Sequence, residues 1–277
     1  MLGTNPWLPR PFEIVSRRDQ TSDTITIDLV PADNEPVPRY LPGQVSMLGI
    51  PGVGEAPISI SGNASQATAL EHTLRVVGSV TSKIASLEVG DQLSVRTPFG
   101  TPWPANSAHG RDLLIIAGGI GLAPLASMLH HAVAHRKDFR RVILLYGART
   151  PEDIVFREWI DHLAVAEAVE VLITVDRADD SWRYDIGMVT RLIGRIGLQP
   201  PQTTAMVCGP GVMMRAVALD LVGRGVGAGE IHVTMERNMH CAAGFCGHCQ
   251  FGGEYICKDG PVFPWWRVAE KFSIPEI

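Results

Sequence analysis

Short stretches in which apolar and polar residues alternate occupy residues 11–103 of the chain. Alternation with frequent β-branched residues is typical of half-buried strands. Strands are predicted at residues 23–30, 44–50, 57–61, 72–78 and 92–97. Turn-forming segments such as PADNEP and SGNAS separate them, and helical periodicity is almost absent. We therefore expect a small antiparallel β-barrel.

The pattern changes after residue 111. Nearly continuous apolar runs lie at 113–118, 141–147, 169–175, 204–209 and 230–235. They alternate with helical stretches at 122–135, 151–166, 189–197 and 212–225. Buried strands that alternate with helices imply right-handed crossovers and a parallel sheet covered on both faces. The second part of the chain is therefore predicted to be a doubly wound α/β domain.

Three parts are expected: the barrel at residues 1–108, the α/β domain at 109–235 and a C-terminal segment at 236–277. The last is too short to build a hydrophobic core of its own without a bound metal.

Composition narrows the class of protein. Charged residues make up 19% of the 277 residues, against about 25% in an average protein, so the chain is expected to fold. A net charge of −5 gives no long-range attraction for phosphate backbones, so we expect no nucleic-acid partner. Glycines and Pro124 interrupt the longest apolar stretch, so we expect no membrane span. The N-terminal residues lack the apolar stretch of a signal peptide, and we expect a cytoplasmic protein.

Four of the five cysteines form the pattern C-x4-C-x2-C-x7-C, made by Cys241, Cys246, Cys249 and Cys257. The first three follow the plant-type ferredoxin spacing, which predicts a [2Fe–2S] cluster. Ala242, Ala243, Gly244 and Gly247 are small enough to let backbone N–H groups approach the sulfurs. The alternative is a structural zinc held by the four thiolates or by a set that includes His240 or His248.

A glycine-rich turn follows the first strand of the α/β domain. In LLIIAGGIGLAPL, Gly118, Gly119 and Gly121 precede a helix whose N-terminus would face a pyrophosphate. Pro124 stands where a dinucleotide fingerprint has a third small residue, so a tight strand-to-helix turn explains the glycines equally well. Farther on, the segment VCGPG places Cys208 and Gly209 at the edge where open α/β sheets bind ligands. Cys208 is also explained as a buried thiol.

In the barrel, Gly78, Ser79 and Thr81 precede a short helical stretch at 83–90. Their backbone and hydroxyl groups are suited to donating hydrogen bonds to a phosphate.

Taken in order, these segments resemble the ferredoxin–NADP reductase superfamily over essentially the whole chain. The segment RNMHCAAGFCGHCQFGGEYICKDGPVF is similar to the gamma-type electron-transfer subunit of cytoplasmic NAD(P)-linked [NiFe] hydrogenases. The corresponding subunits of anaerobic sulfite reductase and of dihydroorotate dehydrogenase are related, the latter usually with a longer gap before the last cysteine. The resemblance implies FAD, a [2Fe–2S] cluster and NAD(P)(H) bound to one chain.

The resemblance also assigns residues to the two nucleotides. The flavin ring and ribityl chain would lie against Pro57, Ile58 and Ser59, and the FAD pyrophosphate against Gly78, Ser79, Val80 and Thr81. The NAD(P) pyrophosphate would lie against Gly118, Gly119, Gly121 and Pro124, and the nicotinamide against Cys208, Gly209 and Pro210. The chain departs from the family where an arginine commonly stands two positions before an aromatic residue, since Glu55, Ala56 and Ile58 occupy that region.

The coenzyme is predicted from the loop after the third strand of the α/β domain. Asp176 would accept hydrogen bonds from a free ribose 2′-hydroxyl and repel a 2′-phosphate, which favours NAD. Arg149 and Arg177 would instead pair with a 2′-phosphate. All three are also explained as solvated loop charges.

The implied path for electrons runs from NAD(P)H through FAD and the cluster to a partner chain, or in reverse. No nickel-ligand pairs or sirohaem site are evident, so we expect the terminal chemistry on the catalytic and iron–sulfur subunits of a hydrogenase-type complex. Phe263, Trp265 and Trp266 are predicted either to contact that partner or to cap the small metal-binding segment. The alternatives are a free-standing reductase and a zinc-bearing nucleotide sensor.

Overall fold

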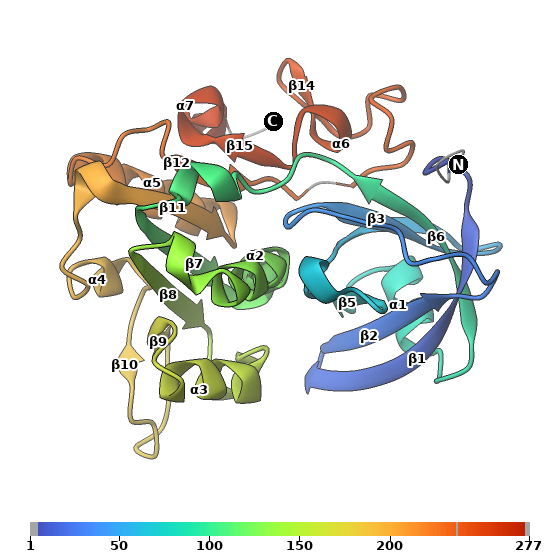
Figure 1. The fold of residues 1–277 in the computed structure, drawn as a ribbon, viewed down its shortest axis with the longest axis horizontal. Helices are drawn as coiled ribbons and strands as arrows, with labels where there is room; N and C mark the ends of the chain where they lie inside the picture. The colour runs from blue at the N-terminus through green and yellow to red at the C-terminus, as the bar shows by residue number, and fades with distance from the viewer. Residues whose placement is uncertain (1–4, 237, 275–277) are drawn as a thin grey trace.

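The computed structural model describes residues 5–236 and 238–274. It has two lobes, with the barrel at the right of Figure 1 and the α/β domain at the left. The C-terminal segment, coloured orange to red, runs across the top of both lobes. The C-terminal segment therefore lies against both lobes.

The barrel is a six-stranded sheet in the order β4-β3-β6-β1-β2-β5, with antiparallel neighbours throughout. Its strands are β1 (Arg10–Thr21), β2 (Thr24–Pro31), β3 (Val45–Ile50), β4 (Gly54–Ser59), β5 (Leu70–Arg75) and β6 (Gln92–Phe99). Ile60, directly after β4, forms an antiparallel bridge with His72 of β5. This bridge joins the two edges of the sheet and closes the barrel.

The five predicted strands are present, but β1 was not predicted individually. Its sequence, RPFEIVSRRDQT, is rich in charge, and only Phe12 and Ile14 of the strand are buried. The helix predicted at 83–90 is also displaced, since α1 spans Ser79–Ala85 and therefore begins within the predicted phosphate-binding segment.

The second sheet has the order β10-β9-β8-β7-β11-β12-β15. Its strands are β7 (Asp112–Gly118), β8 (Arg141–Ala148), β9 (Glu170–Val175), β10 (Asp185–Ile186), β11 (Thr203–Cys208), β12 (Ile231–Thr234) and β15 (Val262–Pro264). All pairs are parallel except β12 with β15. The strand order changes direction between the adjacent strands β7 and β11. Open α/β sheets bind ligands at such a switch point.

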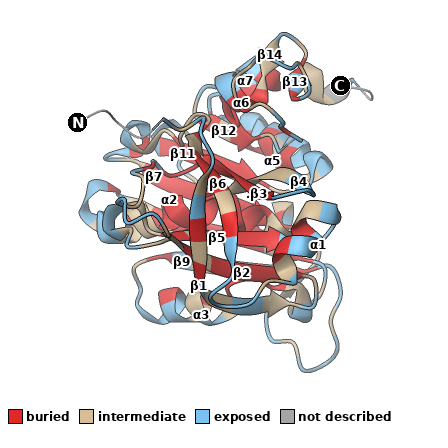
Figure 2. Cartoon of the chain, turned by 90° about the vertical axis from the view of Figure 1, so that its right-hand side faces the viewer, coloured by how far each residue is buried: buried red, intermediate tan, exposed pale blue. Residues whose placement is uncertain are grey.

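Helices cover both faces of this sheet, as predicted. They are α2 (Ala123–Ala134), α3 (Arg157–Val165), α4 (Thr190–Ile193) and α5 (Gly211–Gly223). Along β7, Leu114 and Ile116 enter the core shared with α4 and α5, while Leu113 and Ile115 enter the core shared with α2 and α3. Figure 2 shows burial concentrated on the strands and exposure on the outer sides of the helices.

Short 3₁₀ helices occur along the connections. They span Ala64–Gln66, Ala105–Ala108, Gly119–Leu122, Arg136–Asp138, Pro151–Asp153, Pro200–Gln202 and Lys271–Ser273.

The C-terminal segment is built onto the other two parts. It contains β13 (Gln250–Phe251), β14 (Glu254–Tyr255), α6 (Ile256–Asp259), β15 and α7 (Trp265–Val268). β15 adds a strand to the α/β sheet beyond residue 236, and Thr101, just after β6, donates its backbone N–H to the Gly260 carbonyl at 2.6 Å. Phe263 and Trp265 are buried in the core that this segment shares with α5 and β12.

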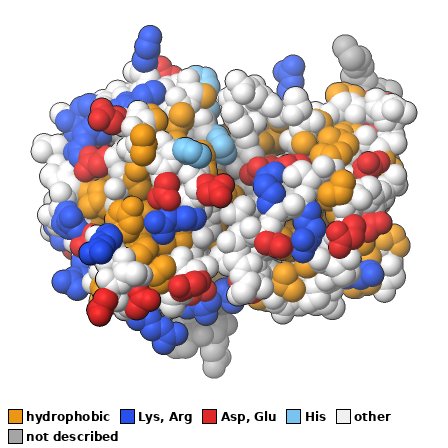
Figure 3. Space-filling view, turned by 90° about the horizontal axis from the view of Figure 1, so that it is seen from below, with side chains coloured by type: hydrophobic (Ala, Val, Ile, Leu, Met, Phe, Trp, Pro, Cys, Tyr) orange, Lys and Arg blue, Asp and Glu red, His pale blue; other side chains and the backbone are white. Residues whose placement is uncertain are grey.

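Positive and negative side chains are interspersed over both lobes in the view from below, with no single sign dominating that face (Figure 3). No helix among the described residues is long and apolar enough to cross a bilayer.

A buried histidine makes the stability of the barrel depend on pH. His72 is fully buried, its Nε2 lies 2.9 Å from Ser46 Oγ, and burial lowers its pKa from 6.5 to about 4. A depressed histidine pKa contributes stability that is complete above pH 6.5 and is lost as pH falls toward 4. For His72 this loss amounts to about 3 kcal/mol.

We therefore expect the stability advantage of the native protein over His72→Gln to shrink by about 3 kcal/mol between pH 7 and pH 4. Urea unfolding at a series of pH values measures this difference. A gap that stays constant with pH would show that His72 is not the responsible group.

Candidate cofactor cleft and metal centre

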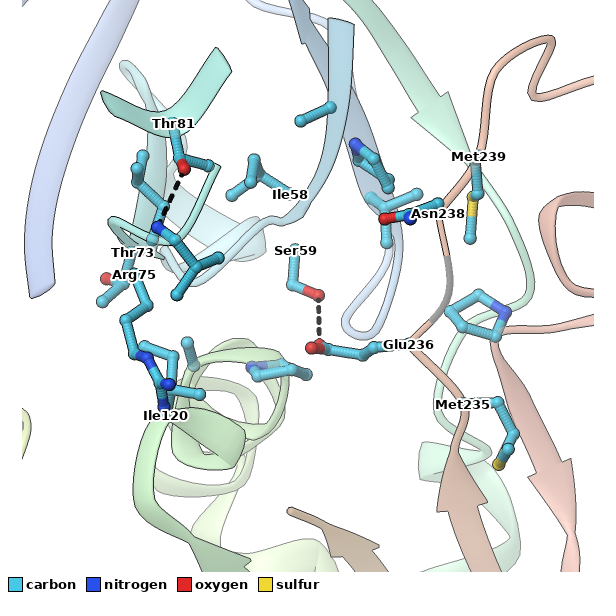
Figure 4. Close-up of a pocket in the computed structure, with 18 of the residues that line it drawn as sticks. Ile58, Ser59, Thr73, Arg75, Thr81, Ile120, Met235, Glu236, Asn238 and Met239 are labelled. Atoms are coloured by element: carbon cyan, nitrogen blue, oxygen red, sulfur yellow. Dashed lines mark hydrogen bonds between the residues drawn. The ribbon is translucent and has the colours of Figure 1, made fainter. Parts of the chain in front are cut away.

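A cavity of about 660 Å³ lies where the barrel, the α/β domain and the C-terminal segment meet (Figure 4). Its lining includes Pro57, Ile58, Ser59, Thr73, Arg75, Thr81, Ile120, Pro124, Met235, Glu236, Asn238 and His248. Four of the seven residues predicted to contact FAD are in this lining, namely Pro57, Ile58, Ser59 and Thr81. Gly78, Ser79 and Val80 lie beside the cavity at the start of α1 and do not line it.

A serine and a carboxyl group face each other across the cavity. Ser59 Oγ lies 3.4 Å from Glu236 Oε1, and Figure 4 shows the two side chains pointing toward one another. Glu236 is open to the cavity, yet the lobes enclose it and this desolvation raises its carboxyl pKa. Cys208 is buried, and its burial together with the charge of Glu236 raises the thiol pKa. Ser59 and Glu236 therefore lie at one end of the cleft, whereas Cys208, Gly209 and Pro210, which were predicted beside the nicotinamide, do not line the cavity.

Glu236 was not predicted from the sequence. The sequence signal for Glu236 was its position just after β12, at the carboxyl end of the α/β sheet, where such folds place ligand-binding side chains. Arg75 was also missed. It lines the cavity from the end of β5 and lies 3.4 Å from Asp23, so it offers a partly exposed positive charge beside the start of α1.

The glycines after β7 hold two strand ends close together. A Cβ atom on Gly121 would lie 2.6 Å from the Cys208 carbonyl oxygen, and one on Gly209 would lie 2.7 Å from Met213 Cε. A Cβ atom on Gly118 would overlap the Met213 sulfur and lie 3.1 Å from Pro210 Cδ. These glycines thus have a packing role that explains them without a ligand.

Gly119 and Pro124 differ from those packed glycines. A Cβ atom on Gly119 would meet nothing within 4 Å, and its carbonyl accepts a hydrogen bond from the Tyr146 hydroxyl at 3.1 Å. Pro124 lies in the first turn of α2 and lines the cavity. The backbone around Gly119 is therefore the open part of this turn.

Thr81 organises the start of α1. Its Oγ1 accepts hydrogen bonds from the backbone N–H groups of Val77 at 3.1 Å and Gly78 at 3.0 Å. The hydroxyl that was expected to face a phosphate is therefore engaged with the turn itself.

A second cavity, of about 620 Å³, lies beyond the carboxyl ends of β8 and β9. It is lined by Arg157, Arg177 and Arg183 and by the rings of Trp182 and Tyr184. The Arg157 guanidinium lies 5.6 Å from the Trp182 ring centre and 5.7 Å from that of Tyr184. The cavity thus combines aromatic rings with charged groups of both signs, since Glu152 and Asp179 also line it.

Of the three residues predicted to select the coenzyme, only Arg177 lines this second cavity. Arg149 is at the same edge, since its carbonyl accepts the Arg177 N–H at 3.1 Å, but its side chain is paired with Asp153 at 2.8 Å. Asp176 is exposed outside the lining.

The four clustered cysteines are joined in two pairs, because the backbone N–H of Cys246 donates to Cys241 Sγ at 3.5 Å and that of Cys257 donates to Cys249 Sγ at 3.5 Å. Within the described ranges, no group of three or more His, Cys, Asp or Glu side chains is arranged to hold a single metal ion. A [2Fe–2S] cluster needs two thiolates on each of its two irons, which matches this pairing. A tetrahedral zinc would instead need four ligands around one point. The donor set therefore fits a [2Fe–2S] cluster.

Backbone amides point at these sulfurs, as the small residues in the loop predict. The N–H groups of Ala243 and Phe245 lie 3.3 Å from Cys241 Sγ, and that of Gly244 lies 3.1 Å from Cys257 Sγ. Burial acts to raise the pKa of Cys241, but the amide hydrogen bonds outweigh it and lower the pKa to about 6. The loop thus favours a thiolate, the form that binds metal.

Two histidines connect the cavity to the cysteine loop. The rings of His240 and His248 are stacked, with centres 3.7 Å apart. His248 lines the cavity and immediately precedes Cys249, and His240 immediately precedes Cys241. The stacked pair therefore spans from the cavity to the cysteines.

The structure distinguishes the two alternatives predicted for the C-terminal aromatics. Phe263 and Trp265 are buried because the segment uses them as core, and of the three only Trp266 is exposed. The exposed aromatic beside the metal-binding loop is instead Phe245, which is 92% accessible and adjoins the exposed Cys246. An exposed phenylalanine inside a metal-binding loop was the missed signal.

Two family models match the chain. The model for the oxidoreductase NAD-binding domain matches residues 115–218, and the model for the iron–sulfur cluster binding domain of dihydroorotate dehydrogenase B matches residues 236–269. The second match contains the four paired cysteines.

Two curated relatives from Pyrococcus furiosus are similar over most of their length. Sulfhydrogenase 2 subunit gamma is 35% identical, covering 95% of this chain and 96% of the relative. A probable dihydroorotate dehydrogenase B (NAD(+)) electron transfer subunit is 33% identical, covering 81% and 80%.

Solved structures share the fold. NADH-dependent reduced ferredoxin-NADP oxidoreductase superposes with a TM-score of 0.73 at 20% identity, covering all of this chain and 96% of the other. Ferredoxin NADP+ reductase from Neisseria gonorrhoeae, solved with FAD and NADP, gives 0.67 at 21% identity, covering 84% and 95%. The arrangement of barrel and α/β domain is thus common to this fold.

The close approach of Gly121 to Cys208 predicts the effect of one added methyl group. Gly121→Ala should push the ends of β7 and β11 apart, reducing stability by about 1–3 kcal/mol and weakening NAD(P)H binding. Chemical denaturation and a fluorescence titration with NAD(P)H measure the two effects. Gly223→Ala, at a position with open space around it, is the matched control and should lower neither quantity. Unchanged stability in Gly121→Ala would contradict the packing argument.

Proposed function

The chain belongs to the ferredoxin–NADP reductase-like family of electron-transfer subunits that includes sulfhydrogenase gamma subunits and dihydroorotate dehydrogenase B electron-transfer subunits, and we propose that it passes electrons between NAD(P)(H), FAD and a [2Fe–2S] cluster. The observation that carries this proposal is the convergence of three sites on one cleft. The turn after β7, the cavity beside β4 and the paired cysteines meet there, and His248 belongs to both the cavity and the cysteine loop.

FAD supplies the exchange between two-electron hydride chemistry and one-electron transfer. Pro57 and Ile58 provide an apolar wall for the flavin, and Arg75 provides a positive charge near its phosphates. Glu236 lies just beyond the end of β12 and Ser59 faces it, so we assign these two residues to orienting the nicotinamide. Cys208, at the end of β11, is buried outside the cavity lining. Positioning of this kind requires no side chain to transfer a proton.

We propose that Cys241, Cys246, Cys249 and Cys257 hold the cluster, with one thiol pair for each iron. The amides on the Cys241 and Cys257 sulfurs stabilise the negative charge that reduction adds. Cys249 and Cys257 are buried, whereas Cys246 is exposed. The Cys246 side is thus where electrons leave or enter the chain.

The partners we propose are the catalytic and iron–sulfur subunits of a cytoplasmic [NiFe] hydrogenase-type complex. Similarity over nearly the whole length of a sulfhydrogenase gamma subunit supports this choice. A dihydroorotate dehydrogenase-type partner is the second candidate, supported by the iron–sulfur domain match. Co-purification of the native chain identifies which catalytic subunit it binds, and recovery of the chain alone would contradict both.

We also propose that the second cavity selects the coenzyme. The prediction of NAD depended on Asp176, which lies outside the cavity lining, whereas three arginines lie within it. Glu152 and Asp179 also line the cavity, and Arg157 is already paired with Asp161 at 2.9 Å, so Arg177 and Arg183 are the arginines left to meet a phosphate. A 2′-phosphate bound near Trp182 would pair with Arg177. The geometry therefore favours NADP(H).

Phe245 provides the test of the partner surface. Phe245→Ser should lower the rate of partner reduction about tenfold, because an exposed aromatic beside the electron exit is the type of residue that dominates interfaces. NAD(P)H-dependent dye reduction should be unchanged, since dyes take electrons from the flavin. Val165→Ser, similarly exposed on α3, is the control and should affect neither rate. Equal loss of both activities in Phe245→Ser would contradict a docking role.

Arg177 provides the test of coenzyme choice. Arg177→Ala should raise the KM for NADPH about tenfold, the cost of one charge-assisted hydrogen bond, and leave the KM for NADH unchanged. Arg149→Ala serves as the control, because Arg149 is already paired with Asp153. Steady-state kinetics with both coenzymes measure this. A native preference for NADH would favour the Asp176 prediction instead.

A further inference from the structure

One guanidinium group joins the wall of the flavin cavity to the cysteine loop. Arg96, on β6, donates from Nε to Glu55 Oε1 at 3.0 Å and from Nη2 to Glu55 Oε2 at 2.5 Å. Its remaining contacts cross to the C-terminal segment, from Nη2 to the His240 carbonyl at 3.1 Å and from Nη1 to the Cys241 carbonyl at 3.2 Å. The Arg96 residue is only 9% exposed.

The partners of Arg96 belong to the two sites between which electrons must pass. Glu55 lies on β4, directly before Ala56, Pro57, Ile58 and Ser59, which line the cavity. His240 and Cys241 begin the cysteine loop, and the His240 ring stacks on that of His248 in the cavity wall. A shift of the Arg96 side chain therefore changes the spacing between the two sites.

The Arg96 side chain is also held in place by aromatic contacts within the barrel. The Arg96 guanidinium carbon lies 5.6 Å from the centre of the Phe99 ring, which packs in turn against Trp7 at 5.1 Å. The four hydrogen bonds use the planar fork of an arginine, and a lysine ammonium cannot reproduce them. The position thus requires both the charge and the shape of arginine.

The positive end of the Arg96–Glu55 pair faces the cysteine loop. Nη1 and Nη2 face the backbone of His240 and the ligand Cys241, whereas Glu55 binds the guanidinium through Nε and Nη2. Because Arg96 is buried, solvent screens its charge only weakly over the short distance to the cysteines. Net charge and hydrogen bonding around an iron–sulfur cluster set its reduction potential.

We propose that Arg96, balanced by Glu55, is a positioning residue that fixes the cysteine loop against the flavin strand and sets the reduction potential of the cluster. The inference rests on the proposed function, because it assumes that the cysteines hold a cluster. It concerns residues outside the ligand set and explains why a glutamate stands at the start of the flavin strand: it is the counter-ion of Arg96.

The test uses pairs of variants with opposite expected signs. Arg96→Met removes the positive charge and leaves Glu55 unbalanced, so the cluster potential should fall. Glu55→Gln leaves Arg96 unbalanced, so the potential should rise. Redox titration of the full chain, monitored by the electron paramagnetic resonance of the reduced cluster, measures both. A purely structural role would shift both variants in the same direction or leave both unchanged, and either result would overturn the proposal.

Arg96→Lys separates charge from position. The charge is kept, so the potential should stay near that of the native protein, while the rate of cluster reduction by NAD(P)H should fall about tenfold because the fork to the loop is lost. A native rate in Arg96→Lys would overturn the positioning role. If Arg96→Met fails to fold, Glu55→Gln and Arg96→Lys still decide the question.

Arg10→Met is the matched control. Arg10 forms a bidentate pair with Asp33 at 2.8 Å in the same barrel, and among the described residues none of its hydrogen bonds reaches the C-terminal segment. It should change neither the potential nor the rate. Absence of any cluster signal from the native protein would instead refute the proposed function, which distinguishes the two failures.

Discussion

The C-terminal segment cannot form a core of its own, and the rest of the molecule is arranged around that constraint. Its strand β15 completes the α/β sheet beside β12, and its aromatic residues Phe263 and Trp265 fill the space over α5. The Thr101 and Met235 backbones bond to Gly260 and Pro261 of the same segment. Because the segment is held by both lobes, the cysteine loop is fixed next to the cavity, which His248 also lines.

This arrangement also determines what the cleft contains. The strand β12 ends at Thr234, and the chain then crosses directly over the cavity with Met235 and Glu236 in its wall. A carboxyl group is thereby placed opposite Ser59, at the desolvated end of the cleft. The residues that precede the cysteine loop therefore also supply part of the cavity wall.

Much of this was predictable from the sequence because periodicity depends on local physics. Continuous apolar runs indicated β7, β8, β9, β11 and β12, and the cysteine spacing indicated the metal centre before any fold was known. Residues whose importance depends on distant neighbours were not found. Glu55 and Arg96 are 41 positions apart, and their common contact with the cysteine loop follows only from the folded barrel. Burial is a tertiary property, so the sequence pattern left open whether Phe263 packs inside the protein or contacts a partner, and it did not single out the exposed Phe245.

The unequal exposure of the cysteines has a consequence for chemical durability. Cys249 and Cys257 lie inside the protein, whereas Cys246 faces solvent beside an exposed phenylalanine. Thiolates that solvent can reach are the ones that oxidants attack first. The face that we propose as the electron exit is therefore also the face at which molecular oxygen would first reach the cysteines. A partner docked over Phe245 would act as a shield as well as an electron acceptor, and the isolated chain would be the more fragile form.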